Sequence, residues 1–160
     1  AQAIRKAWDS GWKPVHYLNN VSASLGAVLK PAGLDKSVGL ITTQYLKDHT
    51  DKIWANDPAV IEWTAFMKKY YPEGSLIAGE NFYGWNVAQT MVQVLKQAGN
   101  DLTRANIMKQ AASLKDYVVP GALPGIKLNT SATDFAPFES VRLARFSGAE
   151  WTGFGEIMGK

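Results

Sequence analysis

The sequence predicts an α/β protein with a parallel sheet flanked by helices, from three patterns along its 160 residues. In the first half, short apolar runs rich in β-branched residues alternate with amphipathic segments of helical period. Such runs are typical of buried parallel strands, whose two faces are both covered. Residues 80–98 form the longest amphipathic segment, and residues 138–157 alternate apolar with polar side chains around a Ser147-Gly148 turn, which predicts a β-hairpin.

The first half is expected to begin with a helix over residues 2–10, which Gly11 ends. A strand follows at residues 13–18, where proline stands only near the start and so costs no central ladder bond. The next elements are a polar turn at 19–22, a helix from Leu25 toward Pro31 capped by Ser22 or Ser24, a strand over 37–46 and a charged loop over 48–56.

Helices with clear capping signals form the middle of the chain. Asp57 precedes Pro58, a pair that suits the first turn of a helix running to Tyr71. Along residues 80–98, apolar side chains recur at three- and four-residue spacing: Phe82, Trp85, Ala88, Met91 and Leu95, with Gly99 as the stop. Thr103 caps a helix over 104–114 whose expected inward residues are Ile107, Met108 and Ala111, and 115–137 is irregular apart from a short strand at 126–128.

The start of the helix over residues 80–98 gathers aromatic and amide side chains: Asn81, Phe82, Tyr83 and Trp85. A helix that only packs needs its aliphatic half and does not need such a cluster at its first turn. Two interpretations stay open, namely rings that fill a core and a helix start that faces a ligand. Glu80 and Asn81 also suit the unpaired N–H groups of a first turn.

Composition argues against several classes of function. The net charge of +3 comes from 17 basic and 14 acidic residues scattered along the chain, so we expect no nucleic-acid partner. Cysteine is absent, and the two histidines, His16 in a strand and His49 in a solvated loop, lack the spacing of metal ligands. The sequence also lacks the Gly-x-Ser-x-Gly motif that forms the nucleophile elbow of many hydrolases. We therefore expect no catalytic residues, no metal, no cofactor and no enzyme activity.

At this point particular strings carry a family resemblance. The segments EWTAFMKKYYPEG and NFYGWNVAQTMVQVLKQAGNDLTRANIMKQAASLKD, together with residues 1–48 and LPGIKLNTSATDFAP, resemble the second half of a type I periplasmic solute-binding protein of the branched-chain amino acid ABC transporter class. The similarity covers essentially the whole chain. The chain also opens without methionine and without a cap residue before its first helix, so we expect a fragment whose signal peptide lies outside it.

The resemblance implies an organisation in two lobes that close on a small solute. Residues 1–73 would belong to the second lobe. Residues 74–130 would contain a hinge crossing near 74–78 and helices that complete the first lobe, and residues 131–160 a return crossing with the terminal hairpin. The apolar faces of the first-lobe helices would then need cover, either from a missing N-terminal half of the protein or from self-association.

The resemblance also implies a set of ligand-binding positions. They are Asn19, Asn20 and Ser22 in the turn after the first strand, Tyr45 at the end of the second strand, and Asn81, Phe82 and Tyr83 at the start of the long helix. The turn lacks the carboxylate that often meets an α-amino acid in this family, which leaves room for a carboxylate or aromatic solute.

The leading functional hypothesis is the solute-binding component of an ABC importer, located in the periplasm. It would capture a small amino acid-like, aromatic or carboxylate solute in an interlobe cleft, perform no chemistry, and deliver the solute to a membrane permease. The alternative is a ligand-sensing regulatory domain of the same fold. The sequence at the N-terminal side of the fragment would separate the two, because a signal peptide supports the importer and a DNA-binding or membrane-anchored extension the sensor.

Overall fold

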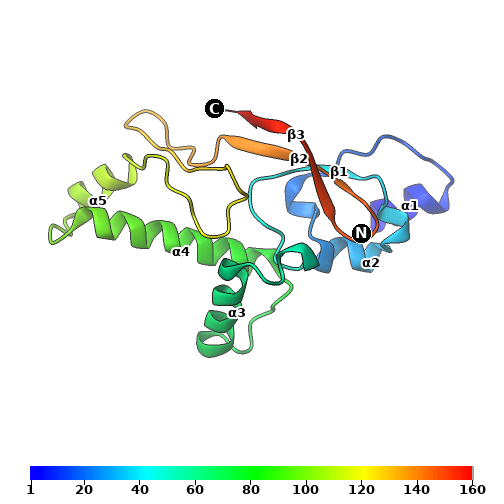
Figure 1. Cartoon of the computed structure of the whole chain (residues 1–160), viewed down its shortest axis with the longest axis horizontal. Coiled ribbons are helices and arrows are strands. Elements are labelled where there is room, and N and C mark those ends of the chain that lie inside the picture. Colours follow the sequence, from blue (N-terminus) through cyan, green and yellow to red (C-terminus); the bar gives the residue numbers. More distant parts are fainter. Residues whose placement is uncertain (160) are drawn as a thin grey trace.

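A computed structural model describes residues 1–159 as an elongated molecule, with a small sheet at one end and a long helix leading away from it (Figure 1). The helices are α1 (Gln2–Asp9), α2 (Lys30–Ala32), α3 (Pro58–Tyr70), α4 (Gly79–Ala98) and α5 (Arg104–Ala111). The strands are β1 (Ile41–Gln44), β2 (Ser140–Phe146) and β3 (Trp151–Gly159). A π-helical turn, η2 (Leu25–Leu29), leads directly into α2, and short 3-10 turns lie at Asn20–Ser22, Asp35–Ser37 and Lys52–Trp54. Within the described residues, no helix has the length and apolar character needed to span a bilayer.

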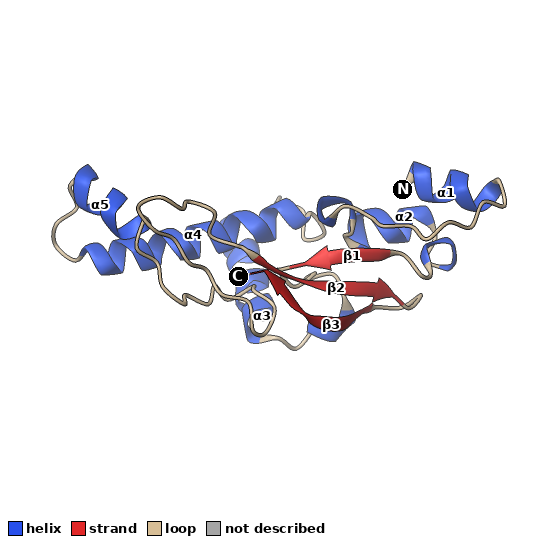
Figure 2. Ribbon diagram, turned by 90° about the horizontal axis from the view of Figure 1, so that it is seen from above, coloured by secondary structure: helices blue, strands red, loops and turns tan. Residues whose placement is uncertain are grey.

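The sheet has the order β1-β2-β3, and both strand pairs are antiparallel (Figure 2). The α/β class is confirmed, and the β2–β3 hairpin is antiparallel as the sequence predicts. Among residues 1–159, the parallel contact is a single bridge between Tyr17 and Ile41. The segment over 13–18 does run along β1, with Leu18 N donating to the Ile41 carbonyl at 2.7 Å, but the pairing is too short to form a strand.

Hydrogen bonds from hydroxyl side chains accompany the ends of other predicted elements, which are shorter than expected. The strand expected over 37–46 begins only at Ile41, because Ser37 ends a 3-10 turn and its Oγ donates to the Gly33 carbonyl. The helix expected over 104–114 ends at Ala111, because the Thr130 hydroxyl donates to the Ala111 carbonyl and accepts from Leu114 N. The strand expected at 126–128 is reduced to one bridge between Tyr117 and Leu128.

Two apolar clusters organise the described residues. The first lies between the sheet and the α1–η2–α2 segment, and its buried members include Ile4, Leu25, Leu29, Leu40, Phe146 and Trp151. The second fills the corner between α3 and α4 with Val60, Trp63, Met67, Phe82 and Trp85. Asp57 caps the start of α3, accepting from Ala59 N at 3.0 Å, as the sequence predicts.

The apolar face of α4 is only partly covered. Phe82 and Trp85 are buried against α3, whereas Met91 and Leu95 remain 48% and 40% exposed. Met108 of α5, expected to face inward, is 56% exposed. Helices α4 and α5 therefore carry an uncovered apolar strip beyond their first turns.

Buried Asn86 of α4 joins this helix to the segment that follows α5. Its Oδ1 accepts from Gly121 N at 2.7 Å, and its Nδ2 donates to the Phe82 carbonyl at 2.8 Å. A Cβ at Gly121 would overlap the Asn86 side chain, so this position requires glycine. The same segment pairs with the continuation of β1, where Leu123 N donates to the Tyr45 carbonyl.

A buried carboxylate ties the sheet to the loop after β1. Asp51 is only 1% exposed, although the sequence predicts a solvated loop there. Its Oδ2 accepts from Trp151 N at 2.8 Å, and its Oδ1 accepts from Ile53 N at 3.2 Å. The Trp151 indole N–H donates to the Ala23 carbonyl at 3.0 Å. Burial raises the pKa of Asp51 despite its two N–H donors.

Asp51→Ala is expected to lower the free energy of unfolding by about 3 kcal/mol, because it leaves two backbone N–H groups without acceptors. Chemical denaturation with an unchanged m-value measures this loss. Asp35→Ala, at an exposed position, serves as the control and should change stability by less than about 0.5 kcal/mol. Equal effects of the two substitutions would contradict the tie through Asp51.

Candidate functional site

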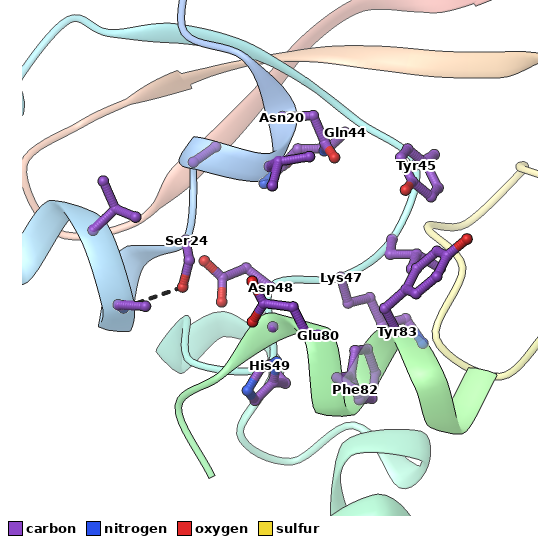
Figure 3. A pocket seen from close by; sticks show the side chains of 16 residues that line it. Asn20, Ser24, Gln44, Tyr45, Lys47, Asp48, His49, Glu80, Phe82 and Tyr83 are labelled. Atoms are coloured by element: carbon purple, nitrogen blue, oxygen red, sulfur yellow. Dashed lines mark hydrogen bonds between the residues drawn. The ribbon is translucent and has the colours of Figure 1, made fainter. Parts of the chain in front are cut away.

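A cavity of about 440 Å³ lies where three chain segments meet. These are the turn and helix start at 20–28, the stretch 44–49 that continues β1, and the first turn of α4 at 79–83 (Figure 3). The polar or aromatic side chains that line it are Asn20, Ser24, Gln44, Tyr45, Lys47, Asp48, His49, Glu80, Phe82 and Tyr83. The three segments are those in which the sequence predicts a ligand site. The cavity is open to a solute of modest size.

The first wall of the cavity, residues 20–28, is held to the sheet by a side-chain amide. Asn20 Nδ2 donates to the carbonyl of Thr43 in β1 at 2.9 Å, which fixes the turn beside the end of the strand. Asn19 Oδ1 accepts from Val21 N at 2.9 Å and so caps the turn from within. Ser24 Oγ accepts from Ala27 N at 3.2 Å as the cap of η2.

The second wall of the cavity, residues 44–49, is bound to the start of η2 by hydrogen bonds of Asp48 and of the neighbouring Thr50. Asp48 Oδ2 accepts from Leu25 N at 2.6 Å, and Thr50 Oγ1 accepts from Gly26 N at 2.8 Å. A Cβ at Gly26 would lie 2.9 Å from Thr50 Cβ, so the close approach needs glycine. The Asp48 carboxylate thus caps the helix with one oxygen, and its other oxygen accepts from the Thr50 hydroxyl.

The third wall is the first turn of α4. Asn81 Nδ2 donates to the Ser75 carbonyl at 2.9 Å, so this side chain secures the preceding connection. Phe82 is 2% exposed and belongs to the α3–α4 core, whereas Tyr83 is 49% exposed and available to a ligand. Glu80 stands exposed in the same turn.

Two tyrosines line the same side of the cavity in Figure 3, Tyr45 from the strand continuation and Tyr83 from α4. The Tyr45 ring lies 4.8 Å from the Phe138 ring, which limits its movement. Burial, with a smaller contribution from Tyr83, raises the pKa of Tyr45 above its ordinary value of 10.0. Tyr45 therefore keeps its hydroxyl proton at neutral pH and can donate a hydrogen bond.

The charges along the cavity are predominantly acidic. Lys47 directs its ammonium to Asp57 at 2.8 Å and to the Pro120 carbonyl at 3.0 Å, and its side chain is only 10% exposed. Its charge is therefore already balanced by Asp57. Asp48 and Glu80 remain as carboxylates along the cavity, so its electrostatic potential favours positively charged groups.

His49 lies partly buried at the base of the second wall, contrary to the prediction of a solvated residue. Its ring centroid is 4.5 Å from that of Trp63 and 5.1 Å from that of Phe82. Its Nε2 lies 3.1 Å from the Leu76 carbonyl in the connection between α3 and α4. Burial lowers the pKa of His49 below 6.5, against smaller opposing contributions from Asp48 and from the Leu76 hydrogen bond.

The predicted ligand positions divide into two groups. Asn20, Tyr45, Phe82 and Tyr83 line the cavity. The other three, Asn19, Ser22 and Asn81, are not among its lining residues: Asn19 and Asn81 make local hydrogen bonds and Ser22 is exposed.

Sequence reasoning missed several lining residues: Ser24, Gln44, Asp48, His49 and Glu80. The last residue of β1 is Gln44, and Asp48 and His49 follow it in the chain. Ligands of open α/β sheets tend to lie beyond the carboxyl ends of strands, and this tendency indicates the same region. The described residues contain no group of three or more metal-binding side chains.

Comparisons with known proteins identify the family and the fold. The family described as "Periplasmic binding protein" matches residues 1–150. A branched-chain amino acid ABC transporter protein from Thermus thermophilus has 15% identity and a TM-score of 0.74 over 99% of this chain and 42% of its own. A substrate-binding periplasmic protein from Ralstonia solanacearum has 18% identity and a TM-score of 0.69 over 99% and 42%.

A leucine-binding protein from Thermotoga maritima has 14% identity and a TM-score of 0.62 over 98% of this chain and 41% of its own. These likenesses confirm the type I binding-protein fold. The chain spans about two fifths of the length of these structures. A comparison with curated proteins finds no match.

The lowered pKa of His49 predicts that the protein loses stability as the pH falls below 6.5. In that range the unfolded chain takes up a proton before the folded protein does, so the free energy of unfolding decreases, by at most about 1.4 kcal/mol per pH unit. Urea denaturation between about pH 7.5 and about pH 5 measures this slope.

His49→Gln should flatten the slope, because it removes the titrating ring. A slope that persists in His49→Gln would assign the pH dependence to other groups.

Proposed function

The chain belongs to the periplasmic binding protein family, and from that premise we propose that it captures a small organic solute in the cavity bounded by residues 20–28, 44–49 and 79–83. The solute would pass unchanged to a membrane ABC permease. The observation that carries this proposal is the meeting of three separate segments, each fastened by its own hydrogen bonds, around one cavity.

An amino acid-like solute with an apolar or aromatic body fits the lining best. Tyr45 and Tyr83 offer ring faces and hydroxyl donors, which suit a ring or a branched aliphatic group. The turn at 19–22 lacks a carboxylate, but Asp48 and Glu80 supply acidic charge from the other two walls, which suits an ammonium group. The Thermus thermophilus protein was crystallised with bound valine, in agreement with this class. An aromatic carboxylate is the second candidate class.

Lobe closure would retain the solute. We assign residues 1–73 to one lobe, residues 74–130 to a crossing and the helices of the other lobe, and residues 131–160 to a return crossing with the hairpin. The pairing of Lys47 N with the Gly121 carbonyl at 2.9 Å supports a further crossing where the strand continuation meets the segment after α5. A solute that contacts both lobes favours the closed state by its extra contacts there.

The uncovered strip on α4 and α5 would be covered by a further protein segment. Its exposed apolar side chains are Val87, Met91, Val92 and Leu95 on α4 and Met108 on α5, and exposed Leu102 lies in the loop between the two helices. Either the N-terminal part of a longer chain or a second copy of this chain would bury them. The family supports a periplasmic location.

Tyr83→Ala is expected to weaken solute binding about tenfold or more, because a ring contact and a hydroxyl donor are lost from the cavity. Calorimetric titration with the member of an amino acid and aromatic-acid panel that gives the largest thermal shift measures the change. Tyr70→Ala, a substitution of a similarly exposed tyrosine on α3, should leave affinity unchanged. If no member of the panel binds the unaltered protein, the proposal fails.

The α4–α5 strip predicts that the purified chain does not exist as a lone monomer of 17.5 kDa. Sedimentation velocity should show a larger species, because each large apolar side chain gains up to about 1.5–3 kcal/mol when buried. Met91→Glu combined with Leu95→Glu should shift a self-associated species toward monomer, while Ile61→Glu at an exposed site on α3 should not. A well-folded wild-type monomer would contradict the prediction.

A further inference from the structure

His49 has a defined tautomer in this structure. A carbonyl oxygen only accepts hydrogen bonds, so the 3.1 Å contact between Nε2 and the Leu76 carbonyl requires the proton on Nε2. In the neutral ring, Nδ1 then carries the lone pair and acts as an acceptor. His49 is one of the residues that line the cavity, so its ring belongs to the site.

The ring is also held in place. Trp63 of α3 lies 4.5 Å away in an edge-to-face arrangement, and Phe82 of α4 lies 5.1 Å away on another side. Trp63 is 1% exposed, so these contacts form part of the α3–α4 core. A ring flip would break the hydrogen bond to Leu76, so the orientation of Nδ1 is coupled to this packing.

The charged groups around His49 give its protonation a clear consequence. Asp48 lies on the same loop and Glu80 faces the same cavity from α4. Helix α3 presents the Trp63 ring, and the connection between α3 and α4 presents the Leu76 carbonyl. Lys47 is bound to Asp57. Protonation of the His49 ring would therefore add a positive charge to a lining whose other charged residues, apart from the paired Lys47, are the carboxylates Asp48 and Glu80.

We propose that His49 makes the solute preference of this cavity depend on pH. The neutral ring offers Nδ1 as an acceptor to an N–H or O–H group of the solute, and the carboxylates beside it favour a cationic solute. When a proton from solvent binds Nδ1, the acceptor becomes a donor and the net negative charge of the cavity falls. Acidification then shifts the preference from an ammonium-bearing solute toward a carboxylate. This inference rests on the proposed solute-binding function of the same cavity.

The partial burial of the ring is consistent with this role. Burial lowers the pKa of His49 below 6.5, so the neutral form dominates at neutral pH and the ring is protonated only in more acidic solution. The sequence contains only two histidines, and His16 lies outside this cavity. A signal from each imidazole can therefore be assigned by substitution of the other.

The test uses NMR on the full chain with two probes that share a ring and differ in charge, benzylamine and benzoate. Nitrogen-15 shifts of the imidazoles report the tautomer directly, and titration of each probe at about pH 8 and about pH 5.5 gives its dissociation constant. We expect a pyridine-type Nδ1 at His49 in the neutral protein. We also expect the ratio of the two dissociation constants to move by about tenfold or more toward benzoate on acidification.

Two variants separate the roles of the ring nitrogens. His49→Gln keeps a donor for the Leu76 carbonyl but removes titration, so its probe ratio should no longer depend on pH. His49→Asn keeps a polar group near Nδ1 and loses the hydrogen bond to Leu76. His16→Gln is the matched control and should behave as the unaltered protein, and thermal unfolding verifies that each variant folds.

A proton on Nδ1 in the neutral ring, or a probe ratio with the same pH dependence in His49→Gln, would overturn the inference. If resonances of Tyr45 and Tyr83 respond to the probes with no pH-dependent change in preference, the proposed solute binding stands and the role of His49 falls. If no residue of the cavity responds to either probe at either pH, the proposed solute binding and the proposed role of His49 are both contradicted for these solute classes. A response centred on Trp8, Trp12 and His16 would place binding at the separate cavity near α1 instead.

Discussion

The described structure depends on the buried Asp51 carboxylate and the tryptophan that it holds. Asp51 receives the backbone N–H of Trp151 at the start of β3, and the Trp151 indole reaches the Ala23 carbonyl. Three stretches far apart in the chain are thereby joined at one point, beside the core that Phe146 and Leu29 complete. A buried carboxylate is stable only when its oxygens are satisfied, so the loop after β1 has little freedom to move. The same loop supplies Asp48 and His49 to the lining of the cavity.

Some residues around the cavity hold its walls in place, and others are exposed toward it. Asp48 caps η2, Asn81 secures the connection before α4, and Lys47 is paired with Asp57, so their polar groups mainly hold the walls. Tyr83 and Glu80 are exposed and free to meet a solute. Supporting hydrogen bonds of this kind keep a binding surface rigid before the ligand arrives, which limits the ordering cost of binding.

The local elements could be predicted from the sequence, whereas their pairing could not. Helices α3 and α4 and the terminal hairpin follow from caps, periodicity and a turn that lie within each segment. The strand expected over 13–18 is reduced to one bridge between Tyr17 and Ile41, and the strand expected over 37–46 is shortened to β1, whose partner is the distant β2. The sequence analysis places ligand positions in the three segments that form the cavity, but the roles of Asp48 and His49 depend on contacts with Leu25 and Leu76 that no local pattern reveals.

The central claim, that the cavity between residues 20–28, 44–49 and 79–83 binds one small solute, is tested most directly by native mass spectrometry in the presence of a mixed solute panel. The account predicts a single adduct of one solute per chain, drawn from the amino acid-like or aromatic acid members, that is lost when the protein is unfolded in acid. Adducts of several stoichiometries with every solute, or no adduct with any of them, would contradict it.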